Sequence, residues 1–88
     1  MAPDYRVIAV TDDAGELREP AWLARAESVH RQLRPQLPPE YEARLQVIFA
    51  AGARMALVVD ADSVCSVALW RVVENTYEGR RLYVDDLV

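Results

Sequence analysis

The second half of the chain holds three strand-like segments joined by turns too short for a parallel arrangement. The segments are ARMALVVD at residues 53–60, VCSVALWRVV at 64–73 and RLYVDDLV at 81–88, with connections at 60–63 and 74–80. Parallel strands need a crossover of a dozen or more residues, whereas a short turn joins antiparallel neighbours. The sequence therefore predicts a three-stranded antiparallel meander.

The first half supplies one more strand and two helices. Residues 5–10 (YRVIAV) are β-branched and apolar and precede a turn-prone segment, which predicts a first strand. Pro20 suits the first turn of a helix that Pro35 ends, and a second helix runs from near Pro39 to Gly52. Their apolar stripes are Trp22, Ala26, Val29 and Leu33, then Tyr41, Leu45, Ile48 and Phe49. The order β-α-α-β-β-β predicts an α+β fold, with a mostly antiparallel sheet and two helices packed on it.

Charge and composition exclude several classes of function. The 88 residues, 52% hydrophobic and 27% charged, fit one globular domain. A net charge of −4 argues against nucleic acid, whose phosphates select basic surfaces, and it permits a cationic ligand. No apolar run reaches the length of a membrane span, and the N-terminus lacks the apolar core of a signal peptide. We expect neither nucleic acid nor a membrane as partner, and the cytoplasm as the default location.

The single cysteine and the single histidine offer little chemistry. Cys65 lies inside an apolar run, which predicts a buried free thiol rather than a reactive one. His30 is expected on a helix surface and receives no function. A metal site would need several Cys or His ligands, more than the chain contains.

The last predicted strand, residues 81–88, has a partner on one side only. Its other edge would be a row of free N–H and C=O groups on a largely apolar strand, which proteins usually cover or pair. Residues 1–88 are therefore expected to form a single, incomplete domain. Either a second copy pairs with this strand in a homodimer, or a missing second half completes the sheet.

Two adjacent carboxylates, Asp85 and Asp86, stand in that strand among apolar neighbours. Because side chains alternate along a strand, they should face opposite sides of the sheet unless a bulge intervenes. In the register of a short hairpin, Arg71 lies opposite Tyr83 and diagonal to Asp85, within reach of an ion pair. One interpretation is therefore structural, with Asp85 paired to Arg71 and Asp86 as a polar group that caps the helix layer or deters edge pairing.

Catalysis is the other interpretation. Loss of hydration on a half-buried strand raises the pKa of a carboxylate, and such a group can take a proton from an ammonium ion, directly or through water. Tyr77 and Tyr83, close in sequence, would add an aromatic wall, since a cation favours the faces of aromatic rings. Trp70 points to the opposite face in the same register and is expected in the core.

The stretch VALWRVVENTYEGRRLYVDDLV, residues 67–88, is similar to the central hairpin of polyamine and thialysine acetyltransferases. With the element order, it resembles the first half of the GNAT family of N-acetyltransferases and its acyl-CoA N-acyltransferase fold. In those enzymes the first acid of the last strand helps to bind or deprotonate the amine. The resemblance assigns this role to Asp85, with Asp86 as its neighbour, and places Tyr41 at the lip of the acceptor site. The implied substrate is a small cationic amine.

The resemblance also implies acetyl-CoA as co-substrate. In the family the exposed backbone of the fourth strand, here Leu87 and Val88, pairs with the pantetheine arm. An Arg/Gln-x-x-Gly-x-Gly/Ala loop then cradles the pyrophosphate. This sequence has no such loop, because Gly15, Gly52 and Gly79 lie far apart. The family's usual general acid, often a tyrosine near the end of the domain, is absent as well.

Two functional hypotheses follow. In the first, the chain is the acceptor-side half of an N-acetyltransferase, inactive alone, and the other half continues the chain or is a separate polypeptide. The assigned residues are Asp85 for catalysis, Tyr83, Asp86, Tyr77 and Tyr41 for substrate, and Leu87 and Val88 for acetyl-CoA. In the second, the chain is a non-catalytic α+β interaction or dimerisation module.

Overall fold

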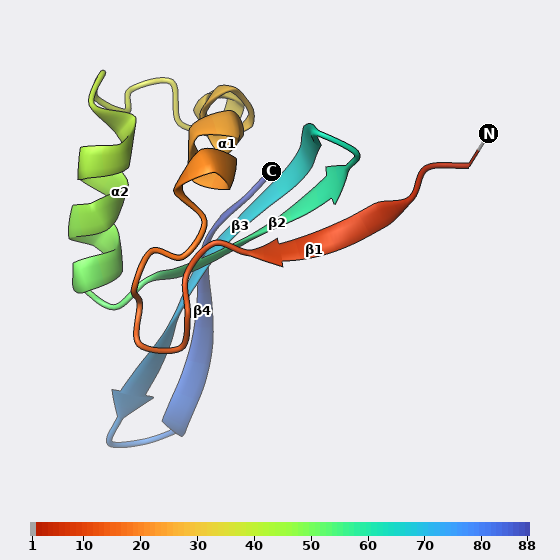
Figure 1. Cartoon of the computed structure of the whole chain (residues 1–88). Helices are drawn as coiled ribbons and strands as arrows, with labels where there is room; N and C mark the ends of the chain where they lie inside the picture. The colour runs from red at the N-terminus through yellow and green to blue at the C-terminus, as the bar shows by residue number, and fades with distance from the viewer. Residues whose placement is uncertain (1) are drawn as a thin grey trace.

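The computed structural model describes residues 2–88 and has the predicted order of elements (Figure 1). These are β1 (Tyr5–Ala9), α1 (Pro20–Leu33), α2 (Tyr41–Ala50), β2 (Arg54–Asp60), β3 (Ser63–Asn75) and β4 (Gly79–Leu87). The predicted α+β class is confirmed. β3 and β4 each extend two residues further toward their shared turn than the sequence indicates, because Gly79 adopts a φ of +77° that allows a tighter connection.

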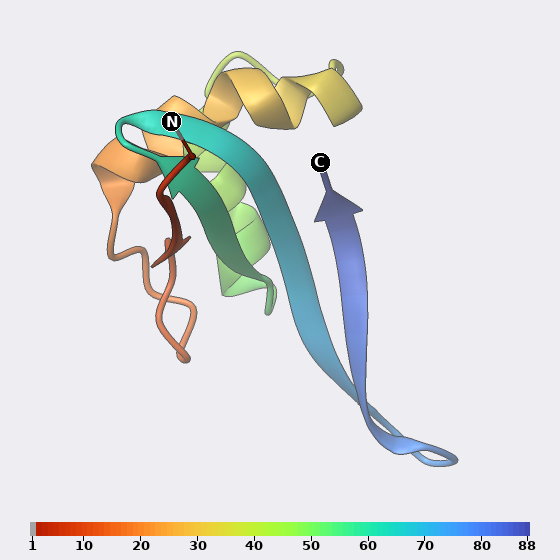
Figure 2. The ribbon, with the colours of Figure 1, turned by 90° about the vertical axis from the view of Figure 1, so that its right-hand side faces the viewer.

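The four strands form one antiparallel sheet in the order β1-β2-β3-β4. Both helices lie on one face of it (Figure 1), and no helix of the described residues covers the other face. The far end of the β3–β4 hairpin extends beyond the helices (Figure 2). The molecule is correspondingly elongated, with extents of 48 × 31 × 23 Å.

The core lies between the two helices and the inner face of the sheet. It contains the predicted stripe of α2 and alternate residues of β2 and β3, as expected for a sheet with one buried face. The buried residues of these three elements are Tyr41, Leu45, Phe49, Met55, Leu57, Val59, Val67 and Leu69.

The buried face of α1 differs from its predicted stripe. Leu23, Ala26 and His30 are buried, whereas Trp22 only flanks the core and Leu33 is exposed. The apolar pattern missed this face because one of its members is polar. A polar side chain becomes compatible with burial only where it finds hydrogen-bond partners.

The outer face of the sheet is apolar and uncovered. The register places six large hydrophobic side chains there that are more than half exposed: Tyr5, Val7, Val72, Leu82, Val84 and Leu87. Trp70 lies on this face, as the register predicted, but it is only partly buried and is not in the core, because no helix of residues 2–88 packs on this face. The prediction for Cys65 is wrong: it is exposed, at an unpaired position where the β2–β3 register shifts near the turn.

Candidate functional site

A β-bulge in β4 decides where the two carboxylates point. Trp70 pairs with Val84 and Leu69 pairs with Asp86, so Asp85 is an extra residue without a partner on β3. Such a bulge interrupts the alternation of side chains along a strand. Asp86 consequently shares the helix-covered face with Leu69.

Asp85 forms the ion pair that the hairpin register predicted. Arg71 lies opposite Tyr83, and its Nε is 2.9 Å from Asp85 Oδ2. Arg71 is two residues from Leu69 in β3 and shares its face, so Asp85 lies on the same side of the sheet as Asp86. The opposite orientation expected from alternation alone is therefore wrong. The two side chains are 31% and 24% exposed, and such a pair contributes roughly 0–1 kcal/mol to stability.

Asp86 is the buried centre of a second, denser set of contacts. Its Oδ2 is 2.7 Å from His30 Nε2, and its Oδ1 is 2.8 Å from Arg34 Nε and 2.7 Å from Arg34 Nη2. The side chains of His30 and Asp86 are 1% and 9% exposed, whereas Arg34 is 43% exposed. These bonds compensate the charge of the carboxylate, as burial requires.

His30 is a member of this cluster that the sequence does not reveal. The sequence predicts a position on the surface of α1, whereas the side chain is buried against β4. One signal for burial was present, because His30 follows Leu23 and Ala26 at the spacing of one helical face. Its partner Asp86 is 56 residues away, and no local pattern reveals such a contact.

His30 also links Asp86 to Tyr41 at the start of α2. His30 Nδ1 lies 2.8 Å from Tyr41 Oη. With its Nε2–H donated to the ionised Asp86, a neutral imidazole accepts at Nδ1 the proton that the Tyr41 hydroxyl donates. Burial, aided by the charge of Glu27, raises the pKa of Tyr41, so the phenol remains a donor. Tyr41, His30, Asp86 and Arg34 form what we call the buried network, which joins α1, α2 and β4.

The pKa of Asp86 reflects two opposed effects. Burial alone would raise this pKa, but the hydrogen bonds from His30 and Arg34, together with the charge of Arg34, lower it below the usual value of 3.8. A carboxyl group with a lower pKa in the folded than in the unfolded state stabilises the fold above the unfolded value. That contribution is lost as the pH falls through the folded value.

The protein should therefore lose stability in acid through Asp86. We expect the free energy of unfolding, measured by urea titration, to fall as the pH drops below the unfolded value of 3.8. Asp86→Asn cannot titrate and should show a shallower fall over the same pH range. An equally steep fall in both proteins would contradict this assignment.

Two arginines fix the connector between α1 and α2 beside the end of β4. Arg31 donates to the carbonyl oxygens of Leu37 and Pro38 at 2.5 and 2.6 Å. Arg34, besides its ion pair, donates to the carbonyl oxygen of Asp85 at 3.3 Å. The connector that leads to Tyr41, which the resemblance places at the acceptor lip, thus begins next to the carboxylates.

The structure brings only some of the predicted tyrosines to this place. Tyr83 is two residues from Asp85 and half exposed. Tyr41 belongs to the buried network and is almost fully buried, so it supports the site and does not line it. Tyr77 lies in the β3–β4 turn and is 77% exposed; at about 3.4 Å per residue, the turn is on the order of 20 Å along β4 from Asp85.

At the end of β4, the peptide groups of Leu87 point toward the open edge of the sheet. Val88 N–H donates to the Val67 carbonyl at 3.0 Å, and Val67 N–H donates to the Val88 carbonyl at 3.2 Å. In an antiparallel pair the adjacent residue directs its N–H and C=O to the other side, so those of Leu87 point outward. Of the two residues predicted to hold acetyl-CoA, Leu87 fits a pantetheine amide, whereas the peptide groups of Val88 are already bonded. Residues 2–88 contain no glycine-rich loop for the pyrophosphate.

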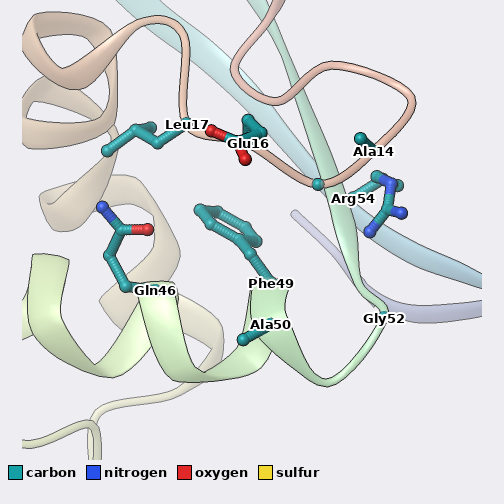
Figure 3. A pocket seen from close by; sticks show the side chains of 9 residues that line it. Ala14, Glu16, Leu17, Gln46, Phe49, Ala50, Gly52 and Arg54 are labelled. Carbon is teal, nitrogen blue, oxygen red and sulfur yellow. The ribbon is translucent and has the colours of Figure 1, made fainter.

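The pocket in Figure 3 lies away from the carboxylates. It has a volume of about 400 Å³ and lies between the loop after β1 and the end of α2, with Glu16 and Phe49 in its wall. Gly15 is favoured there, because residues with a side chain rarely adopt its φ of +84° and a Cβ atom would lie 3.2 Å from the backbone oxygen of Phe49. No predicted site residue lines this pocket.

Residues 2–88 contain no cluster of three or more side chains that could hold a metal ion. None of the helices described in this range is long and apolar enough to cross a membrane. Compared with protein-family models, curated proteins and solved structures, the chain matches none of them. The features of the described residues that bear on function are the carboxylates, the buried network and the open edge of β4.

Proposed function

We propose that residues 1–88 form the acceptor-side half of an acetyl-CoA-dependent N-acetyltransferase that acts on a small cationic amine. The bulge in β4 is the observation that carries this proposal. It turns Asp85 and Asp86 to one face of the sheet, two residues or fewer from Leu87, whose peptide groups point to the open edge. The carboxylates that could attract an amine therefore lie next to the strand edge that could bind the extended arm of a thioester. The resemblance of residues 67–88 to the GNAT hairpin supports the same assignment.

Asp85 would bind the ammonium group of the substrate. Its Oδ2 is engaged by Arg71, while Oδ1 has no hydrogen-bond donor among the described residues. Tyr83 lies beside it with a half-exposed ring, whose face attracts a cation. As the amine nitrogen attacks the acetyl carbonyl, Asp85 receives its proton, directly or through one water.

The buried network would hold this site in place. Both oxygens of Asp86 are engaged by His30 and Arg34, and both nitrogens of His30 are engaged by Asp86 and Tyr41. Neither group is free to take a proton from an amine. Asp86 thus becomes a positioning residue that adds negative charge, in place of the direct substrate ligand that the sequence suggests.

Acetyl-CoA, when bound, supplies the acetyl group as a thioester. Leu87 would align the pantetheine arm through its outward N–H and C=O groups. Recognition of the pyrophosphate and protonation of the departing thiolate require residues outside the described part of the chain. The open edge of β4 and the uncovered outer face of the sheet are the surfaces that would receive them.

Titration of the isotopically labelled chain with spermidine, followed by its amide resonances, tests the acceptor site. We expect the largest shifts at Arg71 and at residues 83–87, because the ammonium group binds Asp85 there. Asp62, an exposed acid in the β2–β3 turn, provides the comparison for non-specific attraction. Shifts spread evenly over the surface acids, or centred on the pocket that contains Glu16, would contradict the proposed site.

A second function, that of a non-catalytic interaction module, is favoured by two observations. The ion pair between Asp85 and Arg71 is present, and the outer face of the sheet is apolar and uncovered. This function predicts that spermidine produces no localised shifts at Asp85, so the same titration separates the two.

A further inference from the structure

We infer that two copies of this chain pair through the outer edges of their β4 strands, around a twofold axis at Tyr83. The inference goes beyond the proposed function and does not rest on it. β4 is the last strand of the sheet and has no partner on its outer side within residues 2–88. Part of it stands clear of the helices (Figure 2), where no other element of the described chain shields it. An open edge of this kind is a template for another strand.

The sequence of β4 is antisymmetric in charge about Tyr83. Leu82 and Arg81 precede Tyr83, and Val84 and Asp85 follow it. In an antiparallel pair centred on Tyr83, Leu82 lies opposite the second copy's Val84, and Arg81 lies opposite the second copy's Asp85. A twofold axis repeats each contact, as an interface between identical copies requires.

The pleat of the strand separates the two kinds of contact. Arg81, Tyr83 and Asp85 lie on the helix-covered side, whereas Leu82 and Val84 lie on the apolar outer face. Opposed residues of an antiparallel pair share a face, so opposite charges meet on one side and apolar side chains meet on the other. Both surfaces of the joined sheet are therefore complementary in the same register.

Both members of the charged pair are available for this contact. Arg81 lies 3.5 Å from Glu78, and both side chains are about half exposed, so this pair competes weakly. Asp85 uses only Oδ2 for Arg71, which leaves Oδ1 for a second arginine.

Neighbouring registers lose this match. A shift in one direction sets Arg81 opposite the second copy's Val84, and a shift in the other sets Leu82 opposite the second copy's Asp85. Each alternative places a charge against an apolar side chain. Because a one-residue slip also exchanges the two faces of a strand, it sets the charged side of one copy against the apolar side of the other. The charge pattern thus selects the register centred on Tyr83.

The bulge at Asp85 limits regular pairing to about five residues on each strand. We therefore expect a weak dimer, with a dissociation constant on the order of 10–100 µM. In this register the second copy's Gly79 lies opposite Leu87, so the dimer covers the edge proposed for the pantetheine arm. A second copy and the acyl donor are alternative occupants of that edge.

Sedimentation velocity of the purified chain over a range of concentrations measures the association without any ligand. Arg81→Glu sets like charges opposite each other at two symmetric positions and should weaken the dimer by about tenfold or more. Arg25→Glu is the matched control: it makes the same charge change on α1, away from the edge of β4, where its ion pair is the exposed one with Asp62. Its effect should stay below about threefold.

A cysteine at the axis tests the register directly. Opposed Cα atoms of an antiparallel pair are about 4.5–5.5 Å apart, within the reach of a disulfide. In a Cys65→Ser background, Tyr83→Cys should therefore oxidise rapidly to a covalent dimer, whereas Tyr77→Cys, in the exposed turn, should do so much more slowly. A chain that is monomeric at all concentrations, equal effects of the two arginine variants, or equal rates for the two cysteines would overturn the inference. Since acetyl-CoA and amine are absent from these assays, such a failure would leave the proposed function untouched.

Discussion

Replacement of Asp86 by alanine should lower the free energy of unfolding by about 3 kcal/mol. The substitution removes the common acceptor of His30 and Arg34 and leaves His30 Nε2 buried without a partner. Loss of one member of a buried charged pair costs roughly 3–5 kcal/mol. The lower end of that range applies here, because Arg34 is partly exposed and can turn toward water.

Urea and thermal unfolding followed by circular dichroism measure this loss. For a domain of this size, the thermal midpoint should drop by roughly 12–24 °C. Asp85→Ala is the matched control, since it removes the same group from the adjacent residue but breaks only a partly exposed ion pair, worth roughly 0–1 kcal/mol. Equal losses in the two variants would show that the buried network does not stabilise the fold as we describe.

Asp85→Asn should weaken the binding of spermidine by roughly tenfold to a hundredfold, because a hydrogen bond to a charged group contributes about 1.5–3 kcal/mol. The amide keeps the shape of the side chain and can still accept a hydrogen bond from Arg71, so the stability of the fold should change by less than about 1 kcal/mol. Isothermal titration calorimetry measures the affinity. Asp62→Asn, an exposed acid in the β2–β3 turn, makes the same change in charge and should alter the affinity by less than about twofold. A similar loss of affinity in both variants would show that spermidine is attracted by the negative surface in general and not by Asp85.

Much of the fold could be predicted because its determinants are local. Short turns between the last three strands require antiparallel neighbours, and the β3–β4 turn sets the register that places Arg71 opposite Tyr83. From that register alone, the ion pair between Arg71 and Asp85 follows. The stripe of α2 is also correct, because its apolar residues recur at helical spacing and face the sheet.

The features that could not be predicted depend on distant parts of the chain. The contact between His30 and Asp86 joins α1 to β4, and a polar residue gives no apolar signal that it will be buried. The bulge at Asp85 changes the face of one carboxylate, and strand alternation cannot anticipate it. The large aromatic side chain of Trp70 predicts a position in the core. Its full burial would need a helix or second sheet on the outer face, and residues 2–88 place none there.

Acetyl transfer to spermidine is the most direct test of the proposed enzyme. Thiol release from acetyl-CoA is measured for residues 1–88 alone and for a chain in which these residues continue into the second half of a GNAT acetyltransferase, with circular dichroism to verify folding. We expect residues 1–88 alone to release no more thiol than a heat-denatured control. The joined chain should release thiol at a rate that Asp85→Asn lowers by about a hundredfold and Asp62→Asn leaves unchanged. Turnover by residues 1–88 alone, or a folded joined chain that releases no thiol, would contradict the assignment of these residues as the acceptor-side half of an N-acetyltransferase.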